Sequence, residues 1–350
     1  MFQDLTLEEW AEQHRTKDLV MIDVRSPSEY AEATIPGSIN IPIFEDDERA
    51  EIGILYKQVS VQAAKDRGLE IVSAKLPEFI KKFAAIPQRK AVFCWRGGMR
   101  SRTTATVLSL MGISAYRLAG GYRAYRQWVV QTLGEAPIEP EACVIHGNTG
   151  SGKTALLRKL QEKGYPVLDL EGLAGHRGSI FGQIGLKANN QKTFDSLLLE
   201  ELMTHKESGY LLMEAESRRI GKVALPDSLM FKKESGYHIF LQMPLESRIR
   251  TILEDYRPEE HQEECIHAFH QIKSRIHTPV ANEIEMCLSE ARYGRAVELL
   301  LEYYYDPRYA HSTEQYELES AVNIEASSLE EAVERIEQLL AERYGTAAAG

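Results

Sequence analysis

Residues 142–163 read ACVIHGNTGSGKTALLRKLQEK and join a short apolar run to a glycine-rich turn and then to an amphipathic stretch. The turn at residues 147–154 satisfies the pattern G-x4-G-K-[ST], which is specific when a strand precedes it and a helix follows it. Residues 142–146 predict that strand, and residues 153–163 predict the helix, which Gly164 would end. We therefore expect an α/β domain with a phosphate-binding loop that begins at Gly147.

The residue types of this loop indicate what it would bind. Backbone amides would cradle a di- or triphosphate, Lys153 would reach the terminal oxygens, and Thr154 would ligate Mg²⁺ if the metal takes part. The predicted phosphate-binding residues are Gly147, Asn148, Thr149, Gly150, Ser151, Gly152, Lys153 and Thr154.

The strand that would carry a metal-holding aspartate in an ordinary ATPase lies at residues 210–215 and contains Glu214 instead. A diphosphate-binding site is therefore favoured over an ATPase. Glu214 could bind a metal ion or orient a water molecule. An ion pair with Arg218 or Arg219 is the alternative reading.

A second glycine-rich segment, residues 169–182, reads DLEGLAGHRGSIFG after a strand predicted at residues 166–170. Glycine at this density around histidine and arginine favours a substrate loop, although a flexible connector would have the same composition. His176 could act there as an acid or a base. The candidate substrate residues are His176, Arg177, Ser179, Glu214, Glu216 and Arg218. Arg248, Arg250 and Arg257 could contact phosphate, although a solvated helix face would explain them equally well.

The pattern outside these loops predicts two α/β domains. Ahead of residue 131, β-rich runs alternate with amphipathic runs at residues 19–24, 27–33, 69–83, 91–94 and 103–110. Further strands are expected at residues 237–243 and 320–324, and a last helix from Ser328 to Gly345. We assign residues 1–130 to a first domain, 131–141 to a linker and 142–350 to a P-loop NTPase-like domain with helical additions at 245–305.

Cys94 follows the apolar strand of the first domain and precedes a loop that leads into a helix. Backbone amides in such a loop, together with the helix dipole and nearby arginines, would favour a thiolate and hold an anion. The predicted catalytic residue is Cys94, with an anion-binding loop of Trp95, Arg96, Gly97, Gly98, Met99 and Arg100. A buried structural cysteine is the alternative reading.

Several segments around Cys94 resemble the rhodanese family. They appear in the family's order and read Asp23-Val24-Arg25, Glu29-Tyr30, residues 35–42 (IPGSINIP) and residues 118–122 (LAGGY). The resemblance implies a rhodanese-like N-terminal domain in which Asp23 and Arg25 support the fold. Two features depart from the family pattern, since Thr34 replaces the usual histidine and the loop reads C-x5-R, as in rhodanese-fold phosphatases. A wider loop also suits selenium or selenophosphate.

Charge is unevenly distributed along the chain of 350 residues. The net charge is −11, yet residues 79–134 contain ten basic and no acidic residues. Such a stretch suits a polyanion or a phosphate-like substrate, and Arg117, Arg123 and Arg126 are candidate contacts for that partner. Pairing of these arginines with acidic neighbours is the alternative reading.

Bulk composition excludes several classes of protein. With 43% hydrophobic and 27% charged residues the chain is typical of globular proteins. No apolar run approaches a membrane span, the first residues lack a signal-peptide pattern, and four scattered cysteines indicate reduced thiols. We expect a cytoplasmic protein without DNA or membrane as a partner.

The ordered set of motifs resembles the tRNA 2-selenouridine synthase family over nearly the whole chain. The decisive segments are residues 94–101 (CWRGGMRS), 176–182 (HRGSIFG) and 214–221 (EAESRRIG). The resemblance implies a transferase acting on tRNA with 2-thiouridine at the wobble position, with Arg117, Arg123 and Arg126 as the candidate tRNA contacts. Geranyl diphosphate would alkylate the sulfur and selenophosphate would replace it with selenium at Cys94, without a tightly bound cofactor. Selenophosphate synthase is a candidate partner.

Other functions fit single motifs. An ATP-dependent tRNA sulfurtransferase or kinase-like enzyme would use the phosphate loop for ATP. A rhodanese-fold phosphatase or a regulatory binding module would account for the C-x5-R loop.

Overall fold

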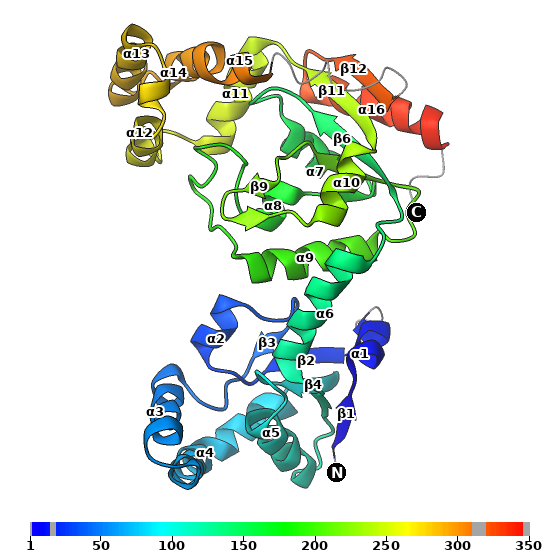
Figure 1. Cartoon of the computed structure of the whole chain (residues 1–350), viewed down its shortest axis with the longest axis vertical. Coiled ribbons are helices and arrows are strands. Elements are labelled where there is room, and N and C mark those ends of the chain that lie inside the picture. Colours follow the sequence, from blue (N-terminus) through cyan, green and yellow to red (C-terminus); the bar gives the residue numbers. More distant parts are fainter. Residues whose placement is uncertain (1, 15–18, 310–319, 346–350) are drawn as a thin grey trace. The chain divides into compact units, whose positions relative to one another are not determined.

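The computed structural model describes residues 2–14, 19–309 and 320–345, and the chain divides into two compact units, Met1–Thr132 and Leu133–Gly350 (Figure 1). The boundary falls within one helix, α6 (Gly121–Glu135). In the described residues no helix has the length and apolarity needed to cross a membrane.

The first unit is built on a sheet of five strands in the order β1-β5-β4-β2-β3, and all its pairings are parallel. The strands are β1 (Gln3–Leu5), β2 (Leu19–Asp23), β3 (Ile39–Asn40), β4 (Arg89–Phe93) and β5 (Tyr116–Leu118). Parallel strands require crossover connections, which explains the alternation of β-rich and helical runs in the sequence.

Helices supply the rest of the first unit. They are α1 (Leu7–His14), α2 (Pro27–Glu32), α3 (Asp46–Gln58), α4 (Val61–Ala84), α5 (Met99–Leu110) and α6. Phe79 and Phe83 of α4 and Leu108 of α5 join the strands in one apolar core. Helix α4 is longer than the predicted run at residues 69–83, because Ser60 caps its N-terminus by accepting from the Ala63 amide.

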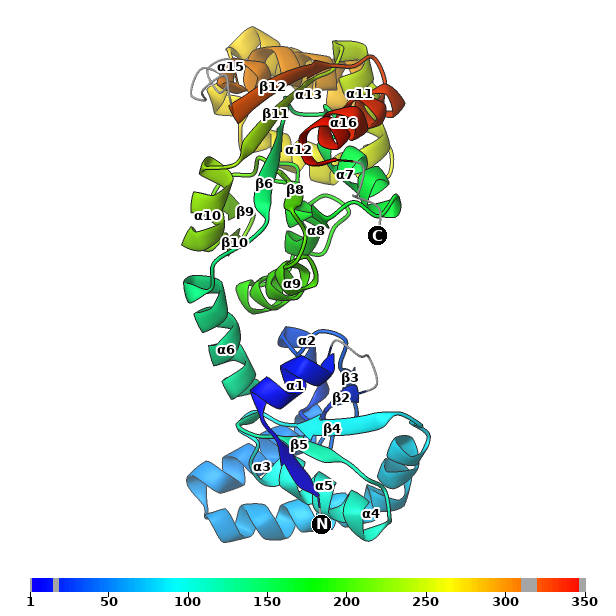
Figure 2. The ribbon, with the colours of Figure 1, turned by 90° about the vertical axis from the view of Figure 1, so that its right-hand side faces the viewer.

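The second unit carries another parallel sheet of five strands, in the order β12-β11-β6-β8-β7 (Figure 2). The strands are β6 (Glu141–His146), β7 (Val167–Leu168), β8 (Tyr210–Glu214), β11 (Tyr237–Gln242) and β12 (Ala321–Glu325), and a separate antiparallel ribbon joins β9 (Arg219–Ile220) to β10 (Val223–Ala224). The central strand β6 leads into the phosphate loop, so the loop lies at the carboxyl edge of the sheet, where open α/β sheets bind ligands.

Two groups of helices pack in this unit. Those around the sheet are α7 (Lys153–Glu162), α8 (Leu170–Ala174), α9 (Gln191–Thr204), α10 (Asp227–Glu234) and α16 (Leu329–Tyr344). A second apolar core unites Phe181 and Ile184 with the helical region. That region comprises α11 (Leu245–Tyr256), α12 (Gln262–His270), η1 (Lys273–Arg275), α13 (Thr278–Ser289), α14 (Tyr293–Leu300), the π-helix η2 (Leu301–Tyr305) and α15 (Asp306–Tyr309).

The structure confirms the α/β fold class and corrects two boundaries. Helix α6 continues through Glu135 into the expected linker 131–141, because Val129 and Leu133 are buried along it. The strand expected at residues 166–170 is limited to Val167–Leu168. It ends there because Asp169 accepts from the Gly172 amide and starts α8.

Candidate functional site

The Cys94 loop of the first unit is held by its neighbours in the fold. Cys94 follows β4, is only 3% exposed, and its Sγ lies 3.2 Å from the Ser101 hydroxyl. The Tyr122 amide donates to the Cys94 carbonyl at 2.9 Å, and the Arg123 amide donates to the Trp95 carbonyl at 2.9 Å. The LAGGY segment is therefore the backbone support of the cysteine loop.

The backbone at Gly121 packs closely against the backbone of the cysteine loop. Its φ is +60°, and a Cβ there would lie 2.2 Å from the Cys94 carbonyl oxygen and 2.5 Å from the Gly97 nitrogen. Only glycine fits both the conformation and the space.

The arginines near the loop differ in their roles. Arg100 donates to Glu29 at 2.5 and 3.1 Å, so its charge is already matched. Burial alone would raise the pKa of Glu29, but the hydrogen bond and charge of Arg100 leave that pKa lowered. Arg96 is exposed, so its guanidinium group can contact an anion that binds in the loop.

Arg117 does not belong to an exposed tRNA-binding surface, contrary to the prediction from sequence. It is buried, donates to both Asp4 oxygens at 2.7 and 2.6 Å, and donates to the Gly97 carbonyl at 2.9 Å. It braces the cysteine loop against β1, because its partner Asp4 is far away in sequence but adjacent in the sheet. Of the three arginines named for tRNA, Arg123 is exposed and Arg126 is half-buried.

Asp23 and Arg25 form a buried scaffold. Their ion pair closes at 2.6 Å, and Arg25 also donates to the Ala33 carbonyl at 2.7 Å. Thr34 donates to Asp23 at 2.9 Å. Thr34 thus supplies a hydrogen bond to the Asp23 carboxylate from the position where the rhodanese family usually has a histidine.

The phosphate loop of the second unit has the geometry that its sequence predicts. Gly152 adopts φ +77° at the N-terminus of α7, and Lys153 Nζ donates to the Gly147 carbonyl at 2.9 Å. Gly150 must be glycine, since a Cβ there would lie 2.7 Å from Ile252. Loop amides at the start of a helix such as α7 can hold phosphate oxygens.

An ion pair between a buried arginine and a partly exposed aspartate fastens this loop to the helical region. Arg248 of α11 donates to Asp306 at 2.6 and 2.9 Å and to the Thr149 carbonyl at 3.0 Å. Asn148 donates to the same aspartate at 3.3 Å. Arg248 therefore holds the loop backbone, and the Asp306 carboxylate neutralises its charge.

Carboxylates gather beside the loop. Glu214 is 0% exposed, its Oε2 accepts from the Leu170 amide at 3.1 Å, and burial raises its pKa well above the ordinary value. Glu171 accepts from the Thr154 hydroxyl at 2.7 Å, and burial and the charge of Glu216 raise its pKa to about 7. Within the described residues, no group of three or more His, Cys, Asp and Glu side chains could hold a metal ion.

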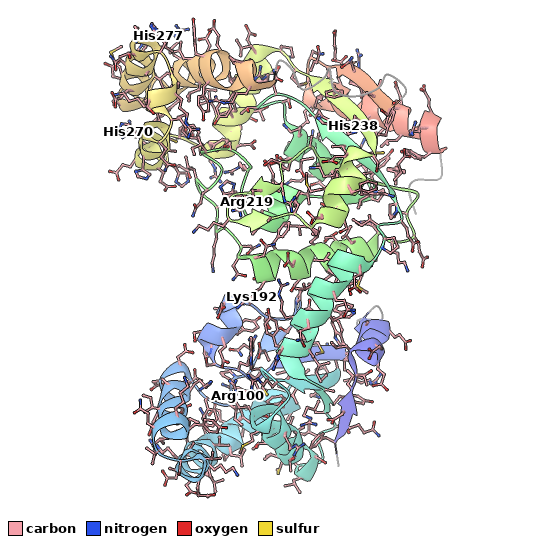
Figure 3. All side chains as sticks on the ribbon, viewed as in Figure 1. Arg100, Lys192, Arg219, His238, His270 and His277 are labelled. Atoms are coloured by element: carbon pink, nitrogen blue, oxygen red, sulfur yellow. The ribbon has the colours of Figure 1, made fainter. Side chains whose placement is uncertain are left out.

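The alternative prediction, an ion pair of Glu214 with Arg218 or Arg219, is wrong. Arg218 pairs with Asp227 at 2.5 Å, and Arg219 is exposed on β9 (Figure 3). Glu216 lies against the glycine-rich segment, because a Cβ at Gly178 would lie 2.5 Å from its carboxylate.

His176 and Arg177 order the glycine-rich segment. A Cβ at Gly182 would lie 2.8 Å from the His176 ring, and a Cβ at Gly221 would lie 2.6 Å from it. The ring therefore joins the HRGSIFG and EAESRRIG motifs, and burial followed by the charge of Arg177 lowers its pKa. Arg177 donates to the carbonyls of Ile184 and Asp255 at 2.8 Å each. The segment is fixed by contacts and is not a free connector.

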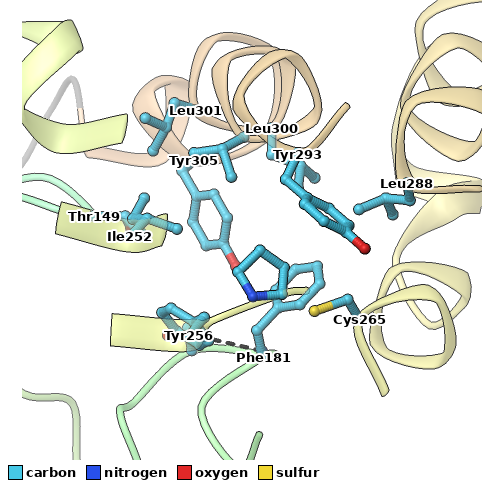
Figure 4. A pocket seen from close by; sticks show the side chains of 13 residues that line it. Thr149, Phe181, Ile252, Tyr256, Cys265, Leu288, Tyr293, Leu300, Leu301 and Tyr305 are labelled. Atoms are coloured by element: carbon cyan, nitrogen blue, oxygen red, sulfur yellow. Dashed lines mark hydrogen bonds between the residues drawn. The ribbon is translucent and has the colours of Figure 1, made fainter. Parts of the chain in front are cut away.

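An apolar cavity opens beside the phosphate loop (Figure 4). Its volume is about 60 Å³. It is lined by Thr149, Ser179, Phe181, Ile252, Tyr256, Pro258, Cys265, Leu288, Tyr293, Val297, Leu300, Leu301 and Tyr305. Ser179 lies 3.0 Å from the Tyr256 hydroxyl, and burial raises the pKa of Tyr256 to about 12. The π-helix η2 contributes Leu301 and Tyr305, and such helices are frequent at functional sites.

Sequence reasoning missed Glu171, Asp306 and the cavity. Glu171 is the second residue of α8, shortly after the carboxyl end of β7, where ligand-facing side chains are expected in a parallel sheet. Asp306 and the cavity had no comparable signal, since both depend on how the helical region folds back onto the loop.

Two family models match the chain. A rhodanese-like domain matches residues 6–127, and a tRNA 2-selenouridine synthase AAA domain matches residues 140–295. The protein is therefore a fusion of a rhodanese-like domain with a P-loop domain.

Curated relatives of the chain are tRNA 2-selenouridine synthases. The tRNA 2-selenouridine synthase of Cupriavidus necator is 32% identical over 334 residues, which cover 85% of this chain and 89% of the relative. The synthase of Nitrosomonas europaea is 37% identical over 68% of this chain, and that of Bdellovibrio bacteriovorus is 36% identical over 69%. These two matches span less than two thirds of the relatives, 64% and 65%. The chain belongs to the tRNA 2-selenouridine synthase family.

Proposed function

We propose that this protein converts 2-thiouridine at the wobble position of tRNA into 2-selenouridine through an S-geranylated intermediate. One observation carries the proposal: Thr149 of the phosphate loop also lines an apolar cavity. A diphosphate on the loop and an isoprenoid chain in the cavity match the two halves of geranyl diphosphate. A nucleotide would require a polar site for its base and ribose.

The cavity also limits how the chain would bind. An apolar cavity of about 150 Å³ binds benzene, whereas this cavity measures about 60 Å³. A whole geranyl chain therefore enters only when the side chains at the cavity, including Tyr305, move outward. We expect tight binding to be coupled to this rearrangement.

The first step transfers the geranyl group to sulfur. The sulfur of 2-thiouridine attacks C1 of the geranyl group, the C1–O bond breaks, and diphosphate leaves while N3 of the base loses its proton. Lys153 would stabilise the diphosphate, and its loop amides would bind the remaining oxygens. Mg²⁺, where it takes part, would be held by the Thr154 hydroxyl and diphosphate oxygens, which are the ligands it prefers.

The second step exchanges sulfur for selenium. Selenium of selenophosphate attacks C2, the C2–S bond breaks, and geranylthiolate leaves and takes up a proton. Water then cleaves the Se–P bond to release phosphate, and N3 regains its proton. Cys94 and its loop belong to this step, with Arg96 as the cation for selenophosphate. An alkylated sulfur leaves more readily than a thiocarbonyl, which explains why one protein would join both steps.

The basic stretch would meet the tRNA through its exposed members, among them Arg123. Glu214 stands where an ordinary ATPase has a metal-holding aspartate, and its Oε2 accepts from the Leu170 amide; this supports diphosphate binding over ATP hydrolysis. Selenophosphate synthase as a partner stays a prediction.

Mass spectrometry of tRNA nucleosides tests the proposal. Full-length protein is incubated with 2-thiouridine tRNA and geranyl diphosphate, and selenophosphate is added afterwards. Lys153→Ala should lose geranylation at low donor concentration, while Cys94→Ser should geranylate normally and fail to selenate. Undiminished geranylation by Lys153→Ala, or ATP consumption in place of geranyl transfer, would contradict the proposal.

A further inference from the structure

A large cavity adjoins Cys94 in the first unit, on the side covered by α3 and α4. Its volume is about 1020 Å³, the size of a full ligand site. We call it the α3–α4 groove. Residues of α3, of α4 and of the Cys94 loop line it, among them Ile54, Leu69, Cys94 and Trp95.

The groove exposes an unusual amount of apolar surface. Six large apolar side chains that line it are exposed, although the first unit has an apolar core of its own. They are Ile54, Tyr56, Val61, Leu69, Trp95 and Met99. Exposed apolar groups gathered around one cavity mark a ligand groove or an interaction site.

The charges around the groove have one sign. Arginine and lysine supply all its charged lining residues, and no aspartate or glutamate lines it. Lys57, Lys65 and Arg96 are exposed, while Arg100 lies at the Cys94 loop with its charge matched by Glu29 (Figure 3). An apolar channel with basic residues around it fits an apolar chain attached to a polyanion.

We propose that the α3–α4 groove binds the isoprenoid chain of the S-geranylated base while that base lies at Cys94. The inference rests on the proposed function, because only that reaction brings a geranylated tRNA to the selenium step. The geranylated base combines a long apolar chain with the phosphates of RNA, and the groove offers both kinds of contact beside the cysteine.

The groove also explains how the second step could recognise its substrate. A base that enters the Cys94 loop carries the geranyl chain with it, and the chain must leave water or remain exposed. Burial of apolar surface favours the first outcome. The groove would therefore select the geranylated base over unmodified 2-thiouridine and position C2 next to Cys94. A protein partner that covers the same apolar surface would show no such selection.

Two alkylated tRNAs test the inference. One carries S-geranyl-2-thiouridine and the other S-methyl-2-thiouridine, both prepared chemically, so the first step is bypassed. Ile54 and Leu69 are 53% and 68% exposed, so Ile54→Gln/Leu69→Gln should fold normally. Leu110→Gln is the matched control, because Leu110 is 80% exposed in the same unit and does not line the groove.

We expect the wild-type protein to bind and selenate geranyl tRNA better than methyl tRNA. The double variant should lower kcat/KM for the geranyl substrate about tenfold and leave the methyl substrate within about twofold, since the loss is confined to apolar contact. The dissociation constant without selenophosphate should rise for geranyl tRNA alone. Leu110→Gln should match the wild type for both tRNAs.

Two results separate the inference from the function on which it rests. An unchanged ratio between the two substrates in the double variant, with selenation intact, overturns the groove assignment and leaves the proposed function standing. Equal loss on both substrates also overturns it, because a chain-binding role predicts selectivity. Failure of the wild-type protein to selenate either tRNA overturns the proposed function, and the groove assignment falls with it.

Discussion

The Arg248–Asp306 pair predicts a measurable weakness in the phosphate loop. Arg248 is buried and makes three hydrogen bonds, two to Asp306 and one to the Thr149 carbonyl. Removing one partner of a buried ion pair costs about 3–5 kcal/mol. Asp306 is 32% exposed and can be solvated once the arginine is gone. For Arg248→Met we therefore expect the lower end, a loss of about 3 kcal/mol.

Hydrogen exchange measures this loss where it occurs. Amides of residues 153–162 in α7 should exchange about one hundredfold faster in Arg248→Met, since each 1.4 kcal/mol changes an opening equilibrium about tenfold. Amides of β2 in the other unit serve as the internal control. KM for the prenyl diphosphate should rise more than kcat falls, because the pair positions the loop and does not touch the reacting atoms.

A double-mutant cycle with Asp306→Asn decides whether the two side chains act together. Coupling of about 1–2 kcal/mol is expected for a direct pair. If the two single changes add within about 0.5 kcal/mol, or if exchange of α7 stays within about threefold of the wild type, the pair does not support the loop and the reasoning is refuted.

Two further predictions concern the other carboxylates and glycines of the sites. Gly121→Ala should reduce selenation more than tenfold with geranylation unchanged, since its Cβ would lie 2.2 Å from the Cys94 carbonyl oxygen, whereas Gly134→Ala, with nothing within 4 Å, should have no effect. Glu171→Gln should stabilise the protein by up to about 3 kcal/mol near pH 8 and by almost nothing near pH 4. The reason is that burial and Glu216 raise the pKa of Glu171 from 4.5 to about 7, so the stability that its protonated form contributes is lost as pH rises through 7. The Glu171 prediction is contradicted if the denaturation midpoints of Glu171→Gln and the wild type differ by the same amount at both pH values. Normal selenation by Gly121→Ala would contradict the other.

Much of both candidate sites could be predicted because their signals are local. The phosphate loop needs glycines at fixed spacing between a strand and a helix, and Gly150 and Gly152 have the positive φ values that this turn requires. The partners of the charged residues could not be predicted. Arg117 and Arg248 looked like anion ligands, yet each is matched by a carboxylate more than fifty positions away, Asp4 and Asp306.

Local patterns in the chain were enough to predict the two α/β units, the order of the two loops and the family resemblance. Periodicity, glycine spacing and motif order act over short stretches, so they can be read without coordinates. Three features required the folded chain: the carboxylate partners of the arginines, the apolar cavity that Thr149 lines, and the apolar groove beside Cys94. Cavities and ion pairs arise where distant segments meet, and the distance between such segments is set by packing, which no local pattern records.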